Sequence, residues 1–372
     1  MFTIGINAHL LSGRAGYRRA GIHHYISQLL AHLPLDAGLA YTVFTAPGEV
    51  VSPRPGLRVQ PSRWPTEQRL LRIGWEQLAW PLAAARQRLD LLHSMAFVTP
   101  LWHACPAVVT VYDLSFLHYP DSFPRLQRLY LGSQTRRSCR QARRVVAISA
   151  SGRADVHRFF GVPLDQIDVV RPAVDAQYHP LPAGAVAEFR RRQGLPAQFV
   201  LHVGTLQPRK NIPVLLEAMA QLSRPGLPLV LVGGKGWLYD QIFARVAALG
   251  LQDRVHFAGY VPDESLPYWY NAATMLVFPS LYEGFGLPVV EAMACGTPVI
   301  TANVSAMPEA AGDAALLFDP HDATALAERM ASVLGNSDLA ATMRHRGLAQ
   351  ARQFDWSHSG RALAATYLAA LK

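Results

Sequence analysis

The segment TMLVFPSLYEGFGLPVVEAMACGTPVIT, residues 274–301, has the pattern of a strand, a turn, a helix and a second strand. The first apolar run ends near Ser280, and Pro288 suits the first turn of a helix that ends at Gly296. The apolar run TPVIT follows directly. Strands that alternate with helices are typical of parallel sheets, so the segment predicts a βαβ unit.

The same segment carries two glutamates, Glu283 and Glu291, in apolar surroundings. Glu283 lies beside Gly284 and Gly286, at a helix start whose free N–H groups and positive dipole end suit a phosphate. Glu291 lies about one turn inside the predicted helix. An unpaired buried carboxylate there would cost several kcal/mol. We therefore expect Glu291 to have a partner, either ribose hydroxyls or a protein arginine or backbone amides.

A second cluster of polar residues lies in HVGTLQPRKNIPVLLEAM, residues 202–219. A predicted strand ends at Gly204, a short loop carries Arg209 and Lys210, and a helix begins near Asn211. Two cations between a strand end and a helix start suit a diphosphate, although exposed Arg-Lys pairs are also common. Because this loop and the Glu283 turn both follow parallel strands, we expect them at one edge of the sheet.

The rest of the chain shows the same alternation in two blocks. In the first block strands are predicted at 2–7, 41–45, 89–93, 107–112, 144–148 and 167–171, and helices at 21–33, 123–143 and 150–160. A linker-like stretch, residues 171–184, precedes the second block. There strands are predicted at 199–206, 227–234, 254–260, 273–280 and 297–301, and helices at 211–223, 237–249, 263–272, 287–294, 322–335, 338–352 and 356–371.

This pattern predicts an α/β fold with two tandem, doubly wound domains. We place the first domain at residues 1–175 and the second at 176–355. In such sheets ligands bind beyond the carboxyl ends of the strands, so a cleft between the domains is the expected site.

The chain's positive charge lies in its first half. The net charge is +9, and residues 1–180 hold 20 arginines, no lysine and 11 acidic residues. A polyanion or an anionic membrane surface would suit this half, but no nucleic-acid recognition motif accompanies the arginines. Several of them share roughly one side of a predicted helix that Leu129 interrupts, and an ordinary solvated face would look the same; they are Arg125, Arg128, Arg136, Arg140 and Arg143.

Cysteine usage and hydropathy exclude several classes of protein. The three cysteines have no CxxC spacing, which predicts neither a disulfide framework nor a zinc site. No run offers the roughly 18–20 apolar residues that a membrane span needs, and the first residues, MFTIGIN, look like a strand rather than a signal peptide. We expect a soluble cytoplasmic protein.

Together, VGTLQPRKNIPVLLEA and VFPSLYEGFGLPVVEAMACGTPVI resemble glycosyltransferase family 4, whose members are retaining enzymes of the GT-B fold. Other stretches agree in order and spacing: RRAGIHHYISQLL, VVTVYDLSFLHYPD, VAISASGRADVHRFFGVP, RVHFAGYVPDESLPYWYNAA and NVSAMPEAAGDAALLFDPHD. The resemblance covers nearly the whole chain. It implies two Rossmann-like domains that face across a cleft, acceptor-side and donor-side, with a C-terminal helix, residues 356–372, that packs back on the first.

The resemblance also implies roles for individual residues. Glu291 would hold the ribose hydroxyls of the donor nucleotide, and Glu283 would contact the sugar and phosphates. Arg209 and Lys210 would stabilise the diphosphate leaving group, so that no metal and no cofactor is needed. Backbone atoms around the phosphates and the base would come from Gly204, Tyr260, Val261, Gly284, Phe285, Gly286 and Leu287. The glycine loop 16–21, with Gly21, would face the donor phosphates or the acceptor.

One position departs from the family pattern. Many members carry His-Asp where this chain has Tyr112-Asp113, and that histidine usually lies near the transferred sugar. Tyrosine can form hydrogen bonds but cannot shuttle a proton near neutral pH. Asp113 or His118 would supply the polar contact, or the contact is dispensable. A histidine such as His118 is as often half-buried and structural. The retaining outcome implies a front-face mechanism, in which the leaving phosphate oxygen accepts the acceptor's proton.

Other functions were weighed against this one. A nicotinamide-dependent dehydrogenase needs G-x-G-x-x-G after the first strand, and the chain has NAHLLSGRAG instead. A phosphorylase or a sugar-nucleotide epimerase would share the fold without this pair of motifs. A catalytically inactive nucleotide-binding scaffold at the membrane stays open. The residues of the motifs VGTLQPRKN and DLSFLHYP resemble mannosyltransferases most, which favours transfer of mannose from GDP-mannose to a glycan or lipid-linked acceptor. A UDP-glucose type of donor is the alternative. Such an acceptor would bring the arginines to the inner face of the cytoplasmic membrane.

Overall fold

The computed structural model describes residues 1–11, 21–48, 51, 54–66, 68–120, 123–236 and 239–372. The chain forms two compact units. The first unit combines Met1–Pro172 with Asp355–Lys372, and the second is Ala173–Phe354. Among the described residues, no helix is both long and apolar enough to cross a membrane.

The first unit contains a seven-stranded parallel sheet with the order β3-β2-β1-β4-β5-β6-β7. The strands are short and mostly buried, as expected of a sheet that helices cover on both faces. They are β1 (Phe2–Asn7), β2 (Leu39–Thr45), β3 (Leu57–Pro61), β4 (Leu91–Ser94), β5 (Ala107–Val111), β6 (Arg144–Ala147) and β7 (Ile167–Val169).

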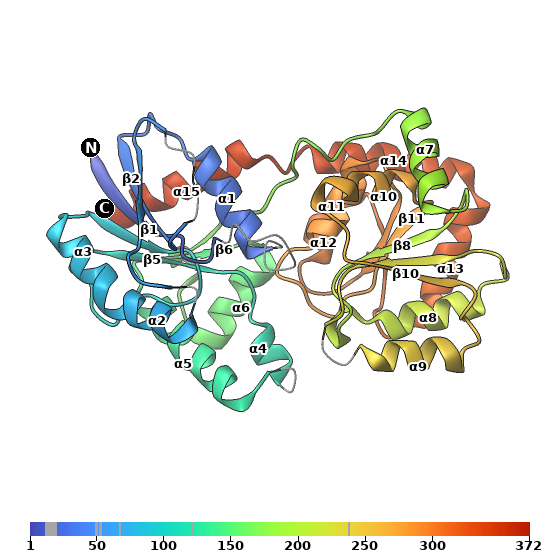
Figure 1. Cartoon of the computed structure of the whole chain (residues 1–372), viewed down its shortest axis with the longest axis horizontal. Coiled ribbons are helices and arrows are strands. Elements are labelled where there is room, and N and C mark those ends of the chain that lie inside the picture. Colours follow the sequence, from blue (N-terminus) through green and yellow to red (C-terminus); the bar gives the residue numbers. More distant parts are fainter. Residues whose placement is uncertain (12–20, 49–50, 52–53, 67, 121–122, 237–238) are drawn as a thin grey trace. The chain divides into compact units, whose positions relative to one another are not determined.

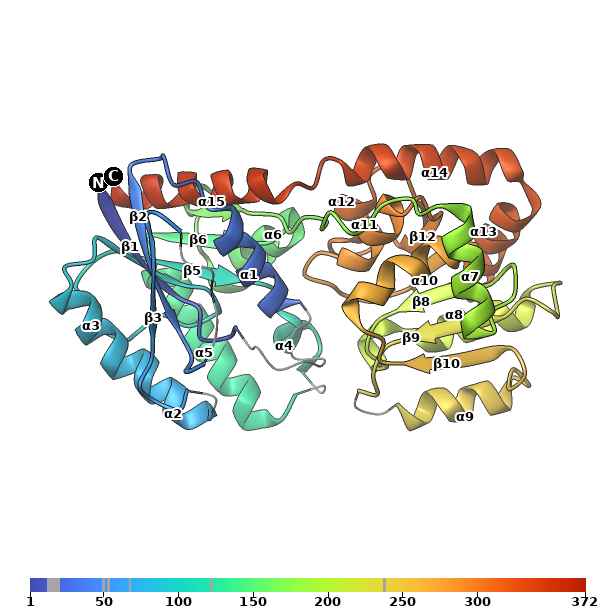
Figure 2. The same cartoon turned by 45° about the horizontal axis from the view of Figure 1, so that its top comes forward.

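Helices cover both faces of this sheet (Figures 1 and 2). On one face α1 (Ile22–His32) packs against α15 (Trp356–Leu371). On the other lie α2 (Arg69–Gly74), a π-helical turn η2 (Trp75–Ala79), α3 (Trp80–Arg86), α5 (Arg125–Gln141) and α6 (Ala150–Phe160). Two short elements, α4 (Ser115–His118) and the 3₁₀ turn η4 (Leu164–Gln166), complete the unit.

The C-terminal helix α15 returns to the first unit, as predicted. The Tyr367 hydroxyl is 2.7 Å from Nδ1 of His93, whose other ring nitrogen lies 2.8 Å from Oγ1 of Thr110 on β5. Gly360 permits close helix packing, because a Cβ at this position would lie only 2.1 Å from the His32 carbonyl oxygen of α1. The chain's two ends therefore lie near each other in the same unit (Figure 2).

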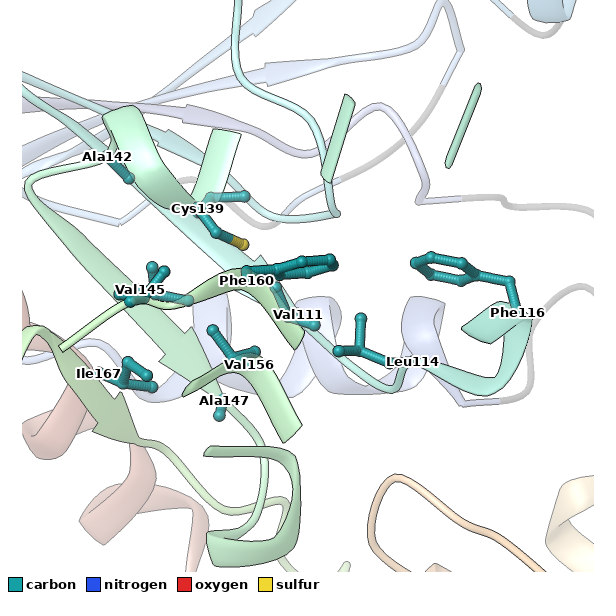
Figure 3. Packing of buried hydrophobic residues seen from close by; sticks show 12 residues of the cluster. Val111, Leu114, Phe116, Cys139, Ala142, Val145, Ala147, Val156, Phe160 and Ile167 are labelled. Carbon is teal, nitrogen blue, oxygen red and sulfur yellow. The ribbon is translucent and has the colours of Figure 1, made fainter. Parts of the chain in front are cut away.

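A buried apolar cluster joins α5 and α6 to strands β5, β6 and β7 (Figure 3). The rings of Phe116 and Phe160 point toward one another at its margin, and Cys139 is fully buried within it. Burial raises the pKa of the Cys139 thiol, so this cysteine is a packing residue rather than a reactive thiol.

The second unit contains a six-stranded parallel sheet with the order β10-β9-β8-β11-β12-β13. Its strands are β8 (Val200–Val203), β9 (Leu229–Val232), β10 (Val255–Gly259), β11 (Met275–Phe278), β12 (Val299–Ala302) and β13 (Leu316–Phe318). Its helices are α7 (Ala183–Gln193), α8 (Ile212–Gln221), α9 (Asp240–Ala248), α10 (Leu266–Ala272), α11 (Leu287–Ala294), α12 (Met307–Ala311), α13 (Ala323–Gly335) and α14 (Ser337–Ala351), with 3₁₀ turns η5 (Pro208–Lys210) and η6 (Asp263–Ser265).

In this unit α8 and α9, with α13 beside α8, lie on one face of the sheet, and α10, α11 and α14 lie on the other (Figures 1 and 2). Both sheets thus share one strand order, with the first strand of each block at the centre. This is the doubly wound arrangement that the alternation of strands and helices predicted.

Several elements were missed in the sequence. Helix α7 begins within the last two residues of the predicted linker, and it has little apolar pattern, because three arginines follow one another near its end and only Val186 is buried. Strands β3 and β13 are short edge strands: β3 is largely polar, and β13 is only three residues long, which gives too short an apolar run to predict a strand. The helix pair around η2 has no regular 3.6-residue pattern, because the π-helical turn shifts the register of its buried side chains.

Candidate active site

The second sheet has its topological switch point between β8 and β11. The chain winds outward from β8 through β9 to β10 on one side, and from β11 through β12 to β13 on the other. Loops that leave neighbouring strands at such a point diverge and open a crevice where ligands bind. Here the loop after β8 carries Arg209 and Lys210, and the loop after β11 carries Glu283.

These three side chains meet in one ion-pair cluster. Nζ of Lys210 donates to Oε1 of Glu283 at 2.6 Å, and Nη1 of Arg209 donates to Oε2 at 2.9 Å. Nη1 of Arg209 also donates to the Tyr282 carbonyl oxygen at 2.5 Å. The side chains are 10%, 17% and 12% exposed for Lys210, Arg209 and Glu283 respectively, so the cluster is largely shielded from water. Two cations share one carboxylate, which leaves a net charge of about +1 at the sheet edge.

The two cations strongly favour the ionised form of Glu283. Burial alone would raise the pKa of this carboxyl, but Lys210 and Arg209 outweigh burial and lower the pKa to about 2. Glu283 is therefore a carboxylate at every physiological pH and a very weak base. Its backbone is held as well, because its amide donates to Oγ of Ser305 and its carbonyl accepts from the same hydroxyl.

Lys210 is fixed from the protein side. Nζ lies 4.8 Å from the centre of the Phe278 ring at the end of β11, a favourable cation–π distance. Below it, His202 is fully buried, and burial lowers the pKa of its imidazole to about 4. Nδ1 of His202 donates to the Val277 carbonyl oxygen at 3.1 Å. The His202 ring is therefore neutral near pH 7, and it does not repel the ammonium group of Lys210.

Two glycines allow the loops to approach closely. Gly204, at the end of β8, has φ +155°, and a Cβ there would lie 3.2 Å from Cε of Lys210. Gly233, after β9, has φ +146°, and a Cβ there would lie 2.0 Å from the Gly204 carbonyl oxygen. Only glycine fits at position 233, so the β8 and β9 loops pack backbone against backbone.

The start of α11 lies directly after Glu283. Gly284 is half-buried, and the Phe285 ring is buried against Phe354 with a centroid distance of 5.3 Å. Gly286 takes the left-handed conformation with φ +108°, and the helix begins at Leu287. The first amides of a helix lack intrahelical acceptors, so this turn presents N–H donors next to the cation cluster.

The partner that the half-buried Glu291 requires is a tyrosine of α10. The Tyr270 hydroxyl donates to Oε2 of Glu291 at 2.7 Å. Burial, with the nearby Glu291 charge, raises the pKa of Tyr270 well above its usual range, so the phenol stays protonated and remains a donor. Tyr178 packs edge-on against Tyr270 at 5.9 Å, and burial, with the nearby Glu291 charge, raises the pKa of Tyr178 as well.

The loop after β10 contains Tyr260 and Val261. Tyr260 is 50% exposed and Val261 is buried. Both line a pocket of about 360 Å³ beside α7 and α10, together with Phe189, Gln193, His256, Phe257, Ala258, Pro262, Ser265 and Trp269.

The remaining predicted site residues lie in the first unit. Gly21, with φ +68°, precedes α1, whereas residues 12–20 of the predicted glycine loop lie outside the described residues. Oδ1 of Asp113 accepts from the Ser115 amide at 2.8 Å, in the turn that leads into the short helix α4. Nε2 of His118 is 2.9 Å from Oδ2 of Asp155 on α6, and its ring packs edge-on against Phe159.

Tyr112 has a packing role in this structure. It is 5% exposed, lies between the rings of Tyr25 and Phe97, and donates its hydroxyl to the Met95 carbonyl oxygen at 2.6 Å. Burial raises its pKa well above the usual range. A sugar contact at Tyr112, which the sequence analysis considered, would require this hydrogen bond to break.

The switch point of the first sheet, between β1 and β4, holds polar residues that the sequence analysis missed. His9 follows β1, is buried, and stacks on Trp75 of η2 at 3.8 Å. Its Nδ1 is 2.7 Å from Oγ1 of Thr66, while Nε2 has no partner among the described residues. Burial raises the pKa of the neighbouring Glu76 carboxyl to about 7, despite Arg72 nearby.

A signal for this cluster was present. The stretch INAH places two polar side chains directly after the first strand, at the carboxyl edge where ligands bind. Glu76 gave no comparable signal, because the π-helical turn that aims it at Asn7 is not visible in the sequence. Within the described part of the chain no group of three or more His, Cys, Asp or Glu side chains is placed to hold a metal ion.

Comparisons with known proteins agree with this arrangement. The family model for glycosyl transferases group 1 matches residues 187–350, and the model for glycosyltransferase family 4 matches residues 19–178. The O-antigen chain mannosyltransferase B of Escherichia coli is 37% identical over 256 residues, which are 68% of this chain and 67% of that protein. A D-inositol 3-phosphate glycosyltransferase of Streptomyces scabiei is 33% identical over 313 residues, 80% of this chain and 66% of that protein.

Solved structures show the same fold. Sucrose-phosphate synthase from Thermosynechococcus elongatus superposes with a TM-score of 0.78 at 25% identity, over 99% of this chain and 98% of that one. WaaG, a glycosyltransferase involved in lipopolysaccharide biosynthesis, superposes with a TM-score of 0.71 at 18% identity, over 97% and 98%. The chain therefore belongs to the group 1 glycosyltransferases of family 4 and is a glycosyltransferase with the GT-B fold.

Proposed function

We propose that this glycosyltransferase transfers mannose from GDP-mannose, with retention of configuration, to a glycan or lipid-linked acceptor in surface polysaccharide or glycolipid assembly. The names of its relatives support the sugar. Beside the O-antigen chain mannosyltransferase B, a serotype-specific mannosyltransferase, WbdA, of Escherichia coli is 29% identical over 222 residues, 58% of this chain.

The observation that carries the proposal is the cluster of Lys210, Arg209 and Glu283 at the switch point of the second sheet. The two cations are held in place before any donor arrives, so they can stabilise the growing negative charge of a diphosphate leaving group without reorganising. Amides at the start of α11 add donors to the same phosphates. In this proposal the fixed cations take the part of a metal ion.

Glu291 and Tyr260 would hold the nucleoside. The carboxylate of Glu291 is oriented by Tyr270 and can accept hydrogen bonds from two ribose hydroxyls. The exposed Tyr260 and the backbone of Val261, at the mouth of the pocket after β10, would contact the base. Gly204 lets the Lys210 side chain lie directly against the loop backbone, where a Cβ would crowd it, and so keeps Lys210 in position for the phosphates.

The acid–base properties of Glu283 suit a front-face reaction. A carboxyl with a pKa of about 2 is a poor acceptor for the proton of an attacking hydroxyl. We therefore propose that the bond from the sugar's C1 to the phosphate oxygen breaks while the acceptor oxygen bonds to C1 from the same side. The hydroxyl proton passes to the departing phosphate oxygen, and Glu283 stabilises positive charge on the sugar.

A panel of donors tests this function. Purified protein is incubated with GDP-mannose, UDP-glucose, UDP-galactose and ADP-glucose, with and without EDTA, and release of the nucleoside diphosphate is measured. Proton NMR of the product gives the anomeric configuration. We expect turnover of GDP-mannose that EDTA does not reduce, and an α-linked product. If only a UDP-sugar is turned over, that sugar replaces GDP-mannose as the donor. If every donor binds tightly and none is turned over, the protein is an inactive scaffold.

A further inference from the structure

The first unit has a second hollow, remote in sequence from the proposed donor residues. It is a groove of about 860 Å³ between α5, the short helix α4 and the end of α6. Its apolar lining residues are Phe116, Leu117, Leu129, Phe159 and Phe160; Leu129 lies at the exposed side, and the rings of Phe116 and Phe160 point toward one another (Figure 3). Four arginines line it as well: Arg128, Arg136, Arg137 and Arg140.

Among the described residues, no ion pair joins the arginines of this groove to a carboxylate. No carboxylate is among the groove's lining residues in the described part of the chain. Arg136 donates to the Phe159 carbonyl oxygen and Arg137 to the Thr99 carbonyl oxygen, both neutral acceptors. Nε and Nη1 of Arg137 are buried without a hydrogen-bond partner among the described residues, and burial lowers the pKa of this guanidinium. Buried donors without acceptors usually mark the place of an absent water, ion or ligand.

A glycine in the middle of α5 gives the groove its depth. A Cβ at Gly132 would lie in ordinary van der Waals contact with Cδ2 of Leu117, at 3.9 Å, so a larger side chain at this lining position would extend into the groove. Glycine is less favourable than alanine within a helix. The fold does not need glycine at this position, which has neither a positive φ nor a close contact.

Exposed apolar side chains continue the groove outward. On the first turns of α5, Leu126 is 83% exposed and Leu129 is 63% exposed, and they directly follow Arg125 and Arg128 respectively. The exposed leucines of the described residues lie in the first unit, and all of them except Leu368 lie in the half of the chain that carries the excess of arginine. Leucines and arginines in alternation on one helix suit the boundary between lipid headgroups and acyl chains.

We propose that this groove binds a single long-chain lipid phosphate, with the phosphate on the arginines of α5 and the hydrocarbon on the phenylalanine and leucine floor. The inference rests on the proposed lipid-linked acceptor and identifies the lipid phosphate of that acceptor as the ligand. Guanidinium groups pair with phosphate oxygens in bidentate geometry, which accounts for arginine rather than lysine along the groove. The leucines at the start of α5 are the point of entry from the membrane.

Binding of dodecyl phosphate to the full chain tests the proposal. The probe is titrated below its critical micelle concentration by isothermal calorimetry, with inorganic phosphate and dodecyl maltoside as controls for the head and the chain alone. We expect saturable binding of one dodecyl phosphate and at least about tenfold weaker binding of either control, because charge-assisted hydrogen bonds and apolar burial each contribute that much.

Matched variants localise the site. Gly132→Leu fills the groove and raises helix propensity, and we expect it to weaken dodecyl phosphate binding at least tenfold while the fold is retained. Arg128→Gln/Arg140→Gln should have a similar effect. Arg125→Gln/Arg143→Gln removes the same charge from exposed positions of the same segment outside the groove, and should change binding less than about twofold.

Three outcomes would overturn the proposal. Equal losses in the two double variants would show diffuse electrostatic attraction, and unchanged binding in Gly132→Leu would place the lipid elsewhere. If an acidic amphipathic peptide binds to the chain and dodecyl phosphate does not, the groove would be assigned to a protein partner. Hydrolysis of the nucleotide-sugar donor in water is measured in parallel with wild type. If wild type hydrolyses no donor, the proposed function is contradicted, whereas the dodecyl phosphate binding result at the groove still stands on its own.

Discussion

The cluster of Glu283 with two cations predicts a separation of stability from diphosphate binding. Glu283→Gln removes the carboxylate that Lys210 and Arg209 share, in a site that is less than one-fifth exposed. The folded-state pKa of about 2 lies some 2.5 units below the ordinary value of 4.5, which corresponds to about 3 kcal/mol of stability. Because the folded pKa is lowered, this contribution is complete above about pH 4.5 and disappears as the pH falls towards 2.

The same substitution should not weaken binding of a nucleoside diphosphate, because the phosphates replace the lost carboxylate as counter-ion to the cations. Lys210→Met should behave in the opposite way. It leaves Glu283 paired with Arg209, so stability falls less, but diphosphate binding weakens at least about tenfold. We therefore expect Glu283→Gln to be the less stable variant but to bind the nucleoside diphosphate. We expect Lys210→Met to be the more stable variant but to bind it weakly.

The stability of the second unit is measured by urea unfolding, with hydrogen exchange in peptides from Ala173–Phe354 as the probe. A probe confined to this unit is needed because a chain of two units need not unfold in one step. Glu217→Gln is the control, because the Glu217–Arg245 pair is exposed and should contribute less than about 1 kcal/mol. The reasoning is refuted if Glu283→Gln is as stable as this control at pH 7, or if it loses diphosphate binding as fully as Lys210→Met.

Three further predictions concern other parts of the molecule. Gly233→Ala should destabilise the second unit by several kcal/mol in urea unfolding, because its Cβ would lie 2.0 Å from the Gly204 carbonyl oxygen; a loss below about 1 kcal/mol would show that the loops can separate. Tyr270→Phe removes the donor to Glu291 and should cost about 1–3 kcal/mol, with weaker nucleoside binding by calorimetry; an unchanged unit would mean that the contact is dispensable. Glu76→Gln should stabilise the first unit by up to about 3 kcal/mol at pH 8 and by little at pH 4.5, because a carboxyl whose pKa is raised to about 7 loses stability as the pH rises from 4.5 to 7; equal effects at both pH values would contradict the burial of Glu76.

The alternation of strands and helices was sufficient to predict both sheets and the edge that carries the candidate site. Parallel strands send all their carboxyl ends to one edge, so the Arg209–Lys210 loop and the Glu283 turn had to come near each other. Their direct ion pairing could not be predicted, because it depends on how far each side chain reaches across the switch point. The sequence analysis assigned Glu283 to the sugar and the cations to the phosphates without this pairing.

The buried contacts of Glu291 and Tyr112 explain two roles that the residue types alone left ambiguous. The apolar run around Glu291 required a partner, but tyrosine was not among the partners that we considered, since Tyr270 lies 21 residues earlier on another helix. Tyr112 was considered for a polar contact because it stands where many relatives carry histidine. The structure instead shows its hydroxyl satisfied by the Met95 carbonyl oxygen, a contact between β-strand ends that only the sheet order brings together.

The most direct test of the donor site is the coupling between Lys210 and the second phosphate of the nucleotide. A thermal-shift screen against UDP, GDP and ADP first selects the nucleotide, and calorimetry then gives dissociation constants of its mono- and diphosphate for wild type and Lys210→Met. We expect the substitution to weaken the diphosphate at least about tenfold more than the monophosphate, a coupling of about 1.4 kcal/mol or more. Equal weakening of both nucleotides would show that Lys210 does not contact the leaving diphosphate.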